Sequence, residues 1–488
     1  MLTQTRLRSA LLGSGAAVAL LMPSAAATAG EVDGLKDQIQ ALQDRLDQIE
    51  QDQAAIDERT QGVAPAMLLV TGGDMEGSFK LPGSDTSMKI GGVLRADFTY
   101  DFDTGNDALG DGSFYFSTIP LDGTAAERRD GEFRFSSQQT WLDIATSTPS
   151  EYGEITTYVS FTFSTTGGRD LSNEFTRNGH TPRLAEAYGT IGPITAGQTV
   201  STFIDYSSYP TTLDFFGPVG ETWLYQTLIR YTHDVGDGMV LKLALENPEI
   251  QAVGTPLVPG GTAVLTGTRT TIGGSTSITG LTYISDGGGL DGPDSYPDAV
   301  IKLEYDDSWG HLGLGGVFRN LEVDNGAGAQ DAALGWGFLA GLWAPTFGDD
   351  SLNAHFIYGE GIGRYVFGGI SDALVTNLVA GQTPDVDPIT VWGWHVGYNH
   401  WWTDSIASNL IFGWVHTDIN VTDAFGPGVR GVAQFSTNEN VQSVHANILW
   451  YPADPVTIGL EYIWGARDTL AGDYATANRI QMAFWYSF

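Results

Sequence analysis

Several basic residues recur with the same orientation along extended segments of this sequence, and they are the residues best suited to bind small anions. A guanidinium or ammonium group pairs with a carboxylate through charge-assisted hydrogen bonds, and arginine offers two donors to two carboxylate oxygens. For any single base, hydration of a wall or pairing with an acid on a neighbouring strand is the commoner role. We expect the set to guide anionic solutes, led by its arginines: Arg95, Arg230, Lys242, Lys302, Arg319 and Arg479.

The sequence offers little for catalysis or metal binding. It contains no cysteine, and its histidines are scattered without the spacing of a zinc motif such as H-E-x-x-H. It has no G-x-S-x-G nucleophile motif and no phosphate-binding loop with its lysine. We expect no catalytic residue, no metal site and no cofactor, and therefore a protein that is not an enzyme.

The candidate bases lie on segments in which apolar and polar residues alternate with the two-residue period of a β-strand. Sixteen such segments occur from residue 88 onwards, among them 133–146, 299–306 and 478–488. A tilted strand needs about 9–11 residues to cross a membrane. Short gaps such as "GP" and "TD" alternate with long ones, as in membrane barrels with short periplasmic turns and long outer loops. We predict an all-β fold, a 16-stranded antiparallel transmembrane β-barrel over residues 88–488.

The distribution of aromatic residues favours a membrane barrel over a soluble sandwich, whose strands would also alternate. Trp309, Trp402, Trp450 and Tyr486 all lie near a short turn or the C-terminus, as in an interfacial aromatic girdle. Backbone groups in hydrocarbon must all be paired, so the sheet must close and its last strand must meet its first. We expect a bacterial outer-membrane location, outer-membrane lipid as a partner, and recognition of the terminal Phe488 by the barrel-insertion machinery.

The N-terminal region has three predicted parts. Residues 1–29 carry two arginines, a short apolar run and an Ala-Thr-Ala cleavage site, which predicts a signal peptide. Apolar residues at alternating spacings of three and four predict a short periplasmic coiled coil over 30–57. A single amphipathic helix lying on the protein body is the alternative. Residues 58–87 are predicted to be a linker.

Charge excludes one class of partner. The chain has 23 basic and 58 acidic residues, a net charge of −35, so we expect no nucleic-acid partner. Most of the acidic surplus falls in the predicted loops and the N-terminal region. Acidic loops at the mouth of a channel repel anions and concentrate cations at low ionic strength.

Two motifs resemble those of the DcaP-like trimeric outer-membrane porins. They are "GSFKLPGSDTSMKIGG" at residues 77–92 and "GQTVSTFIDYSSYPTTLDFFGPVG" at residues 197–220. The coiled coil and the terminal phenylalanine also match. The resemblance implies a homotrimer with a loop folded into each pore and passage of small anionic solutes such as dicarboxylates. It implies that the constriction loop lies at about 201–223, where Asp205 and Asp214 would line the pore.

Three functional hypotheses follow from the sequence. The first is an outer-membrane porin for passive diffusion of small hydrophilic solutes, with a bias towards small carboxylates implied by the resemblance. The second is a cation-preferring or non-selective porin of the same fold. The third is a surface adhesin or structural barrel whose long loops bind a partner.

Overall fold

The computed structural model describes residues 40–48, 51, 71–103, 112–128, 131–164, 180–254, 282–284, 294–324, 328–368, 371–376, 382–419 and 437–488. The chain divides into two units, Met1–Val70 and Thr71–Phe488. The predicted signal peptide, most of the predicted coiled coil and the first part of the predicted linker lie outside the described residues.

The described part of the first unit is a helix at residues 40–48. Leu42 and Leu46 are 67% and 58% exposed, and their four-residue spacing puts them on one face of the helix. Both are seam positions of the predicted coiled coil, which stays a prediction. No helix in the described ranges is long and apolar enough to cross a membrane.

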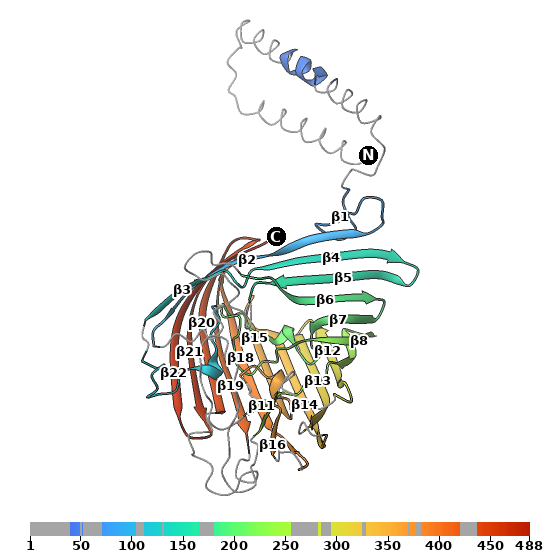
Figure 1. The fold of residues 1–488 in the computed structure, drawn as a ribbon. Helices are drawn as coiled ribbons and strands as arrows, with labels where there is room; N and C mark the ends of the chain where they lie inside the picture. Colours follow the sequence, from blue (N-terminus) through green and yellow to red (C-terminus); the bar gives the residue numbers. More distant parts are fainter. Residues whose placement is uncertain are drawn as a thin grey trace. The chain divides into compact units, whose positions relative to one another are not determined.

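The second unit is built on one large sheet that closes on itself (Figure 1). In the described part of the chain this sheet has eighteen strands; the two-residue β1 (Phe79–Lys80) is an extension, and β3 and β4 share one position. Sixteen positions remain, and neighbouring strands around the barrel are antiparallel, which confirms the predicted 16-stranded barrel. The strands are β2 (Ser87–Asp101), β3 (Glu132–Ser136), β4 (Trp141–Ser150), β5 (Gly153–Thr162), β6 (Arg183–Ile191), β7 (Ile194–Val200), β8 (Tyr225–Gly236), β9 (Met239–Glu246), β12 (Asp298–Asp307), β13 (Gly310–Asp324), β14 (Gln330–Pro345), β15 (Ser351–Glu360), β18 (Thr390–Thr403), β19 (Ile406–Asp418), β20 (Asn438–Ala453), β21 (Val456–Thr469) and β22 (Tyr474–Ser487).

The first and last strands close the barrel. β22 pairs with β2 along Val93–Asp101. The terminal Phe488 exchanges two backbone hydrogen bonds with Gly92, each 3.1 Å long. The strand predicted at 133–146 is divided by a turn in which Thr140 N donates to Ser137 O, so β3 and β4 pair with successive halves of β2.

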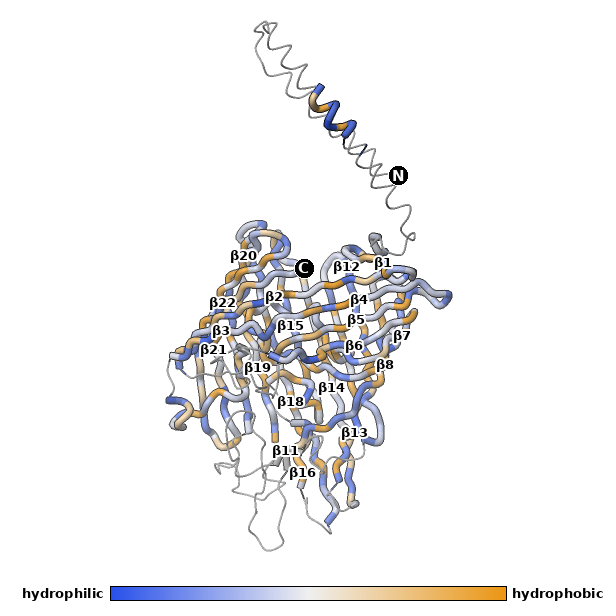
Figure 2. Tube along the Cα trace, turned by 45° about the horizontal axis from the view of Figure 1, so that its top comes forward, coloured by the Kyte–Doolittle hydropathy of each residue, from blue (hydrophilic) through white to orange (hydrophobic). Residues whose placement is uncertain are grey.

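The faces of the barrel are reversed relative to a water-soluble protein. In β12, Ile301 and Leu303 are 47% and 37% exposed, whereas Lys302 between them is 3% exposed. β22 repeats this pattern, with exposed Met482 beside fully buried Gln481. Figure 2 shows the resulting alternation of hydrophobic and hydrophilic residues along the strands. An apolar outer face and a polar inner face are what a membrane-spanning barrel requires.

Three segments between strands pack inside the barrel, at residues 112–121, at 201–224, and at 361–368 with 371–376. Each segment contributes a residue to one buried cluster, namely Phe116, Phe203 and Tyr365. In this cluster they pack with inward valines of the wall such as Val317. A small second sheet includes the end of the third segment and contains β10 (Ala252–Gly254), β11 (Thr282–Ile284), β16 (Ala373–Thr376) and β17 (Asp385–Pro388).

Candidate functional site

Residues 201–223, which connect β7 to β8, lie against the inner wall and contain one 3-10 turn, η3 (Tyr206–Ser208). We call this segment the inner loop. Polar wall side chains bind its backbone: Lys302 Nζ donates to Ile204 O at 2.6 Å, and Asn447 Nδ2 donates to Thr211 O at 2.9 Å. Buried backbone groups need such partners. Further wall residues that contact the loop backbone are Arg95, Glu246, Asn353, His355, His395, Ser443, Glu461 and Gln481.

Asp205 anchors the first half of the inner loop. Its Oδ1 lies 3.0 Å from Lys302 Nζ and 3.0 Å from His311 Nε2. Burial acts to raise the pKa of Asp205, but the hydrogen bond from His311 and the charge of Lys302 outweigh it and hold the pKa below its usual value. Gly341 makes room for this carboxylate, because a Cβ there would lie 1.9 Å from Asp205 Oδ2. Asp205 is 1% exposed, so its carboxylate faces the wall and not open space.

Glu461 of β21 anchors the second half. Its two carboxylate oxygens accept hydrogen bonds from Leu213 N at 2.9 Å and Asp214 N at 3.2 Å. Asn447 Nδ2 donates to it at 2.8 Å, and His445 Nδ1 lies 3.0 Å away. The Glu461 side chain is fully buried, so these partners replace the water that a carboxylate otherwise needs.

Asp214 is buried beside this anchor. Phe114 N donates to its Oδ1 at 2.9 Å, which joins the segment at 112–121 to the inner loop. Burial raises the pKa of Asp214 to about 7, although the charges of His445 and Arg479 oppose the rise. Like Asp205, Asp214 is 1% exposed and does not face open space.

Two of the predicted solute-guiding arginines are enclosed in ion pairs. Arg479 Nε lies 2.6 Å from Asp101, and its side chain is 0% exposed. Arg319 lies 2.9 Å from Asp298 and 2.8 Å from Asp372, with its side chain 1% exposed. A guanidinium that is buried and paired in this way has no donor directed at a passing solute.

Arg95 also serves the inner loop. Its Nη2 lies 2.8 Å from Asp97 Oδ1 and also donates to the carbonyl oxygen of Leu213. The guanidinium carbon lies 4.9 Å from the ring centroid of Trp485. The side chain is 10% exposed, so Arg95 holds the loop with little surface left for a solute.

Arg230 and Lys242 lie on the neighbouring strands β8 and β9. Arg230 faces inwards between Ile229 and Tyr231, which are 50% and 39% exposed on the outer face. It is partly exposed, and it forms no ion pair with an acidic residue of the described chain. Lys242 Nζ lies 2.7 Å from Glu304, and its side chain is 26% exposed.

The inner wall therefore has two unlike sides. Along β12–β22 the inward side chains are buried under the three inner segments. Along β4–β8 small inward residues such as Ser160 and Thr199 are buried. Five larger inward polar side chains there are partly exposed: Asp143, Tyr158, Glu186, Tyr188 and Arg230. The open part of the interior lies along β4–β8.

Sequence reasoning missed the wall anchors and the aromatic side of the inner loop. Asn447 and Glu461 stand at inward positions of adjacent strands, but a polar inward residue has the same pattern whether it meets water or a folded-in loop. The motif "DFFGPVG" could have indicated the aromatic side of the loop, because Phe215 and Phe216 are aromatic residues within an expected aqueous interior.

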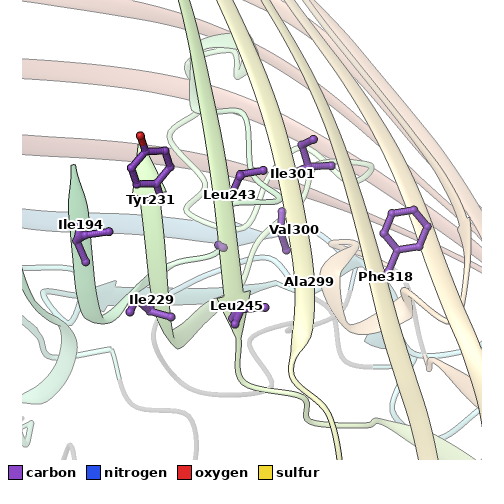
Figure 3. A pocket seen from close by; sticks show the side chains of 10 residues that line it. Ile194, Ile229, Tyr231, Leu243, Leu245, Ala299, Val300, Ile301 and Phe318 are labelled. Atoms are coloured by element: carbon purple, nitrogen blue, oxygen red, sulfur yellow. The ribbon is translucent and has the colours of Figure 1, made fainter. Parts of the chain in front are cut away.

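A separate apolar groove lies on the outer face of β7–β13 (Figure 3). Its lining includes Ile229, Leu243, Ile301 and Phe318, and it contains no charged side chain. Such a groove suits lipid contact and offers no recognition of a hydrophilic solute. The described acidic and histidine residues include no group able to hold a metal ion.

Comparisons with known proteins agree with the geometry. A family model described as a porin subfamily matches residues 75–484. The outer-membrane channel DcaP of Acinetobacter baumannii superposes with a TM-score of 0.64 at 20% identity, over 86% of this chain and 100% of that chain. The anion-selective porin from Comamonas acidovorans gives a TM-score of 0.47 at 9% identity, over 83% and 100% of the two chains. A search of curated proteins found no match.

Proposed function

Because this chain belongs to the porin family, we propose that it forms a water-filled channel in the bacterial outer membrane through which small hydrophilic solutes diffuse passively. The observation that carries the proposal is the contrast between the two sides of the interior. The larger inward polar groups along β4–β8 keep part of their surface exposed, whereas most of those along β12–β22 are covered. A solute path between the inner loop and β4–β8 accounts for this contrast.

We favour cations over anions as the preferred ions of this channel. Five of the six candidate bases, all except Arg230, are ion-paired with carboxylates of the barrel interior. The chain as a whole carries a net charge of −35. Charged loops at the mouth act over about 8 Å at physiological ionic strength, so the preference is modest and grows at low salt.

The reversal potential across a planar bilayer that separates two potassium chloride concentrations tests this preference. We expect a potential whose sign shows faster potassium passage, and a larger deviation at lower salt. A potential of the opposite sign would contradict cation preference and support the second candidate.

The second candidate is a preference for small anions such as dicarboxylates. Arg230 favours it, because within the described chain this inward guanidinium is left without an ion-paired acid. If Arg230 guides anions, Arg230→Ala lowers the chloride-to-potassium permeability ratio. Lys80→Ala is the matched control, because Lys80 pairs with Asp74 beside β1. Equal chloride-to-potassium permeability ratios in both variants and the wild type would show that Arg230 does not guide anions.

Two partners belong to this proposal. A homotrimer is supported by the exposed Leu42 and Leu46 on one face of the N-terminal helix. Recognition of Phe488 by the barrel-insertion machinery is supported by the position of that residue at the barrel seam, where it pairs with Gly92.

A further inference from the structure

Trp223, at the end of the inner loop, is bordered by three other aromatic rings. Its ring centroid lies 5.4 Å from that of Phe215, 5.8 Å from that of Tyr206 and 5.5 Å from that of Tyr225. The three interplanar angles are 82°, 81° and 88°. Each ring thus stands nearly perpendicular to Trp223 in a T-shaped contact.

These rings are not buried in the apolar cluster that fills the covered side of the interior. Tyr206 is 45% exposed, and Phe215, Trp223 and Tyr225 are partly exposed. An aqueous interior gives aromatic rings no favourable environment, so a group of them that remains accessible there marks a binding surface. Trp141 of β4 extends the group, with its ring centroid 5.4 Å from that of Phe215.

Both acidic and basic side chains lie near the rings. Burial raises the pKa of Tyr206, and Tyr225, Tyr209, Glu186 and Glu221 add to the rise. Glu186 is partly exposed on the inward face of β6, opposite the loop.

The charged side chains near Tyr225 include both acidic and basic residues. They are the acidic Asp143 and Glu186 and the basic Arg183. Arg230 is a further basic side chain near Glu186. The fixed charges near the rings are therefore mixed, and Glu186 is a partly exposed acid among them.

We infer that Tyr206, Phe215, Trp223 and Tyr225 form an aromatic cage that binds a methylated ammonium group of a small organic cation, with Glu186 as the nearby counter-charge. The faces of tryptophan and tyrosine rings attract cations through their quadrupoles, and several rings around one site bind quaternary ammonium ions. The methyl groups supply apolar surface that the rings can cover, which a bare potassium ion lacks. The inference rests on the proposed function for the delivery of such solutes, and binding itself can be measured separately.

Ligand-observed nuclear magnetic resonance of the full-length protein in detergent tests the site without any need for conductance. Choline is the probe, and its neutral isostere, in which carbon replaces the nitrogen, is the control ligand. We expect magnetisation transfer to the choline methyl groups and much weaker transfer to those of the isostere. Equal transfer to both ligands, or none to choline, would overturn the cage.

Variants locate the binding. Tyr206→Leu removes an exposed ring, so the fold should survive, and we expect the choline dissociation constant to rise about tenfold. Trp223→Leu should abolish detectable binding. Phe347→Leu is the matched control, because Phe347 is 83% exposed in the turn after β14, and it should bind as the wild type does. Unchanged choline binding in Tyr206→Leu would contradict the assignment.

The same proteins in planar bilayers separate this inference from the proposed function. A conducting channel whose current choline and the isostere reduce equally would refute the cage and leave the channel standing. Choline binding by a protein that never conducts would support the cage and refute the channel.

Discussion

At the scale of single residues, buried carboxylates hold the interior together. Glu461 binds two backbone amides of the inner loop, and Asp205 binds Lys302 and His311 of the wall. At both carboxylates, hydrogen-bond donors of the protein take the place of water. The position of the inner loop, and with it the width of the open passage, should therefore depend on a few buried acids.

Glu461→Gln should loosen the second half of the loop. Glutamine keeps the shape but loses the charge and one acceptor oxygen, so we expect a loss of about 3 kcal/mol in unfolding free energy. Thermal conversion of the folded barrel to its unfolded form on electrophoresis measures the change. Glu154→Gln is the control, because Glu154 is exposed on β5 and should change stability by less than about 0.5 kcal/mol. Equal shifts in the two variants would show that Glu461 is no anchor.

Asp214 should make stability depend on pH. Its pKa is about 7 in the folded protein against 3.8 for an ordinary aspartate, so the protonated form favours folding. The stability that the protonated Asp214 contributes is complete below pH 3.8, falls as the pH rises, and is lost above about pH 7. Asp214→Asn should flatten the stability profile between these two pH values. An identical slope in the wild type and the variant would contradict the buried, protonated state.

Residue roles were only partly predictable. The two-residue period gave the correct inward orientation of Lys302, Arg319 and Arg479. It could not distinguish a base that faces water from one that pairs with an acid brought in by a distant segment. Asp372, for example, reaches Arg319 from a segment far along the chain.

At the scale of elements, glycines in the strands let the inner segments approach the wall. A Cβ on Gly341 would overlap the Asp205 carboxylate, and a Cβ on Gly465 would lie 2.7 Å from Phe114. The strands thus combine two functions, with apolar outer faces for lipid and recessed inner faces for the folded-in loops.

Gly341→Ala should displace Asp205 and destabilise the protein by about 1–3 kcal/mol, the usual range for overpacking. Gly316→Ala on the neighbouring strand is the control, because its Cβ would meet its nearest neighbour at 3.4 Å, an ordinary contact. The same thermal conversion assay compares the two. If both variants matched the wild type, the close approach of loop and wall would be wrong.

Strands were predictable because each one repeats a local period of two, as in 478–488, which contains most of β22. The inner segments were not, because their partners are distant in sequence. Phe114 and Phe116 follow a polar stretch, and nothing local indicates that they pack against β21 inside the barrel. The turn that divides β3 from β4 was also missed, although the outward apolar positions change there from the odd-numbered Phe133 and Phe135 to the even-numbered Leu142.

At the scale of the whole molecule, the N-terminal helix is expected to hold subunits together while each barrel folds by itself. A double change of Leu42 and Leu46 to Asp should lower the trimer population, because charges at seam positions oppose helix association. Gln43→Asp, on the same helix but outside that seam, should leave it unchanged. Light scattering in detergent gives the mass, and a wild-type mass for the double variant would exclude this role of the helix.

We expect the polar face of the barrel to enclose a continuous aqueous passage beside the inner loop. Single-channel current through the purified full-length protein in a planar bilayer tests it most directly. We predict discrete, reproducible conductance steps, and larger steps for Glu461→Gln, whose loop is less firmly held. Complete electrical silence of correctly folded, membrane-inserted protein would contradict the account.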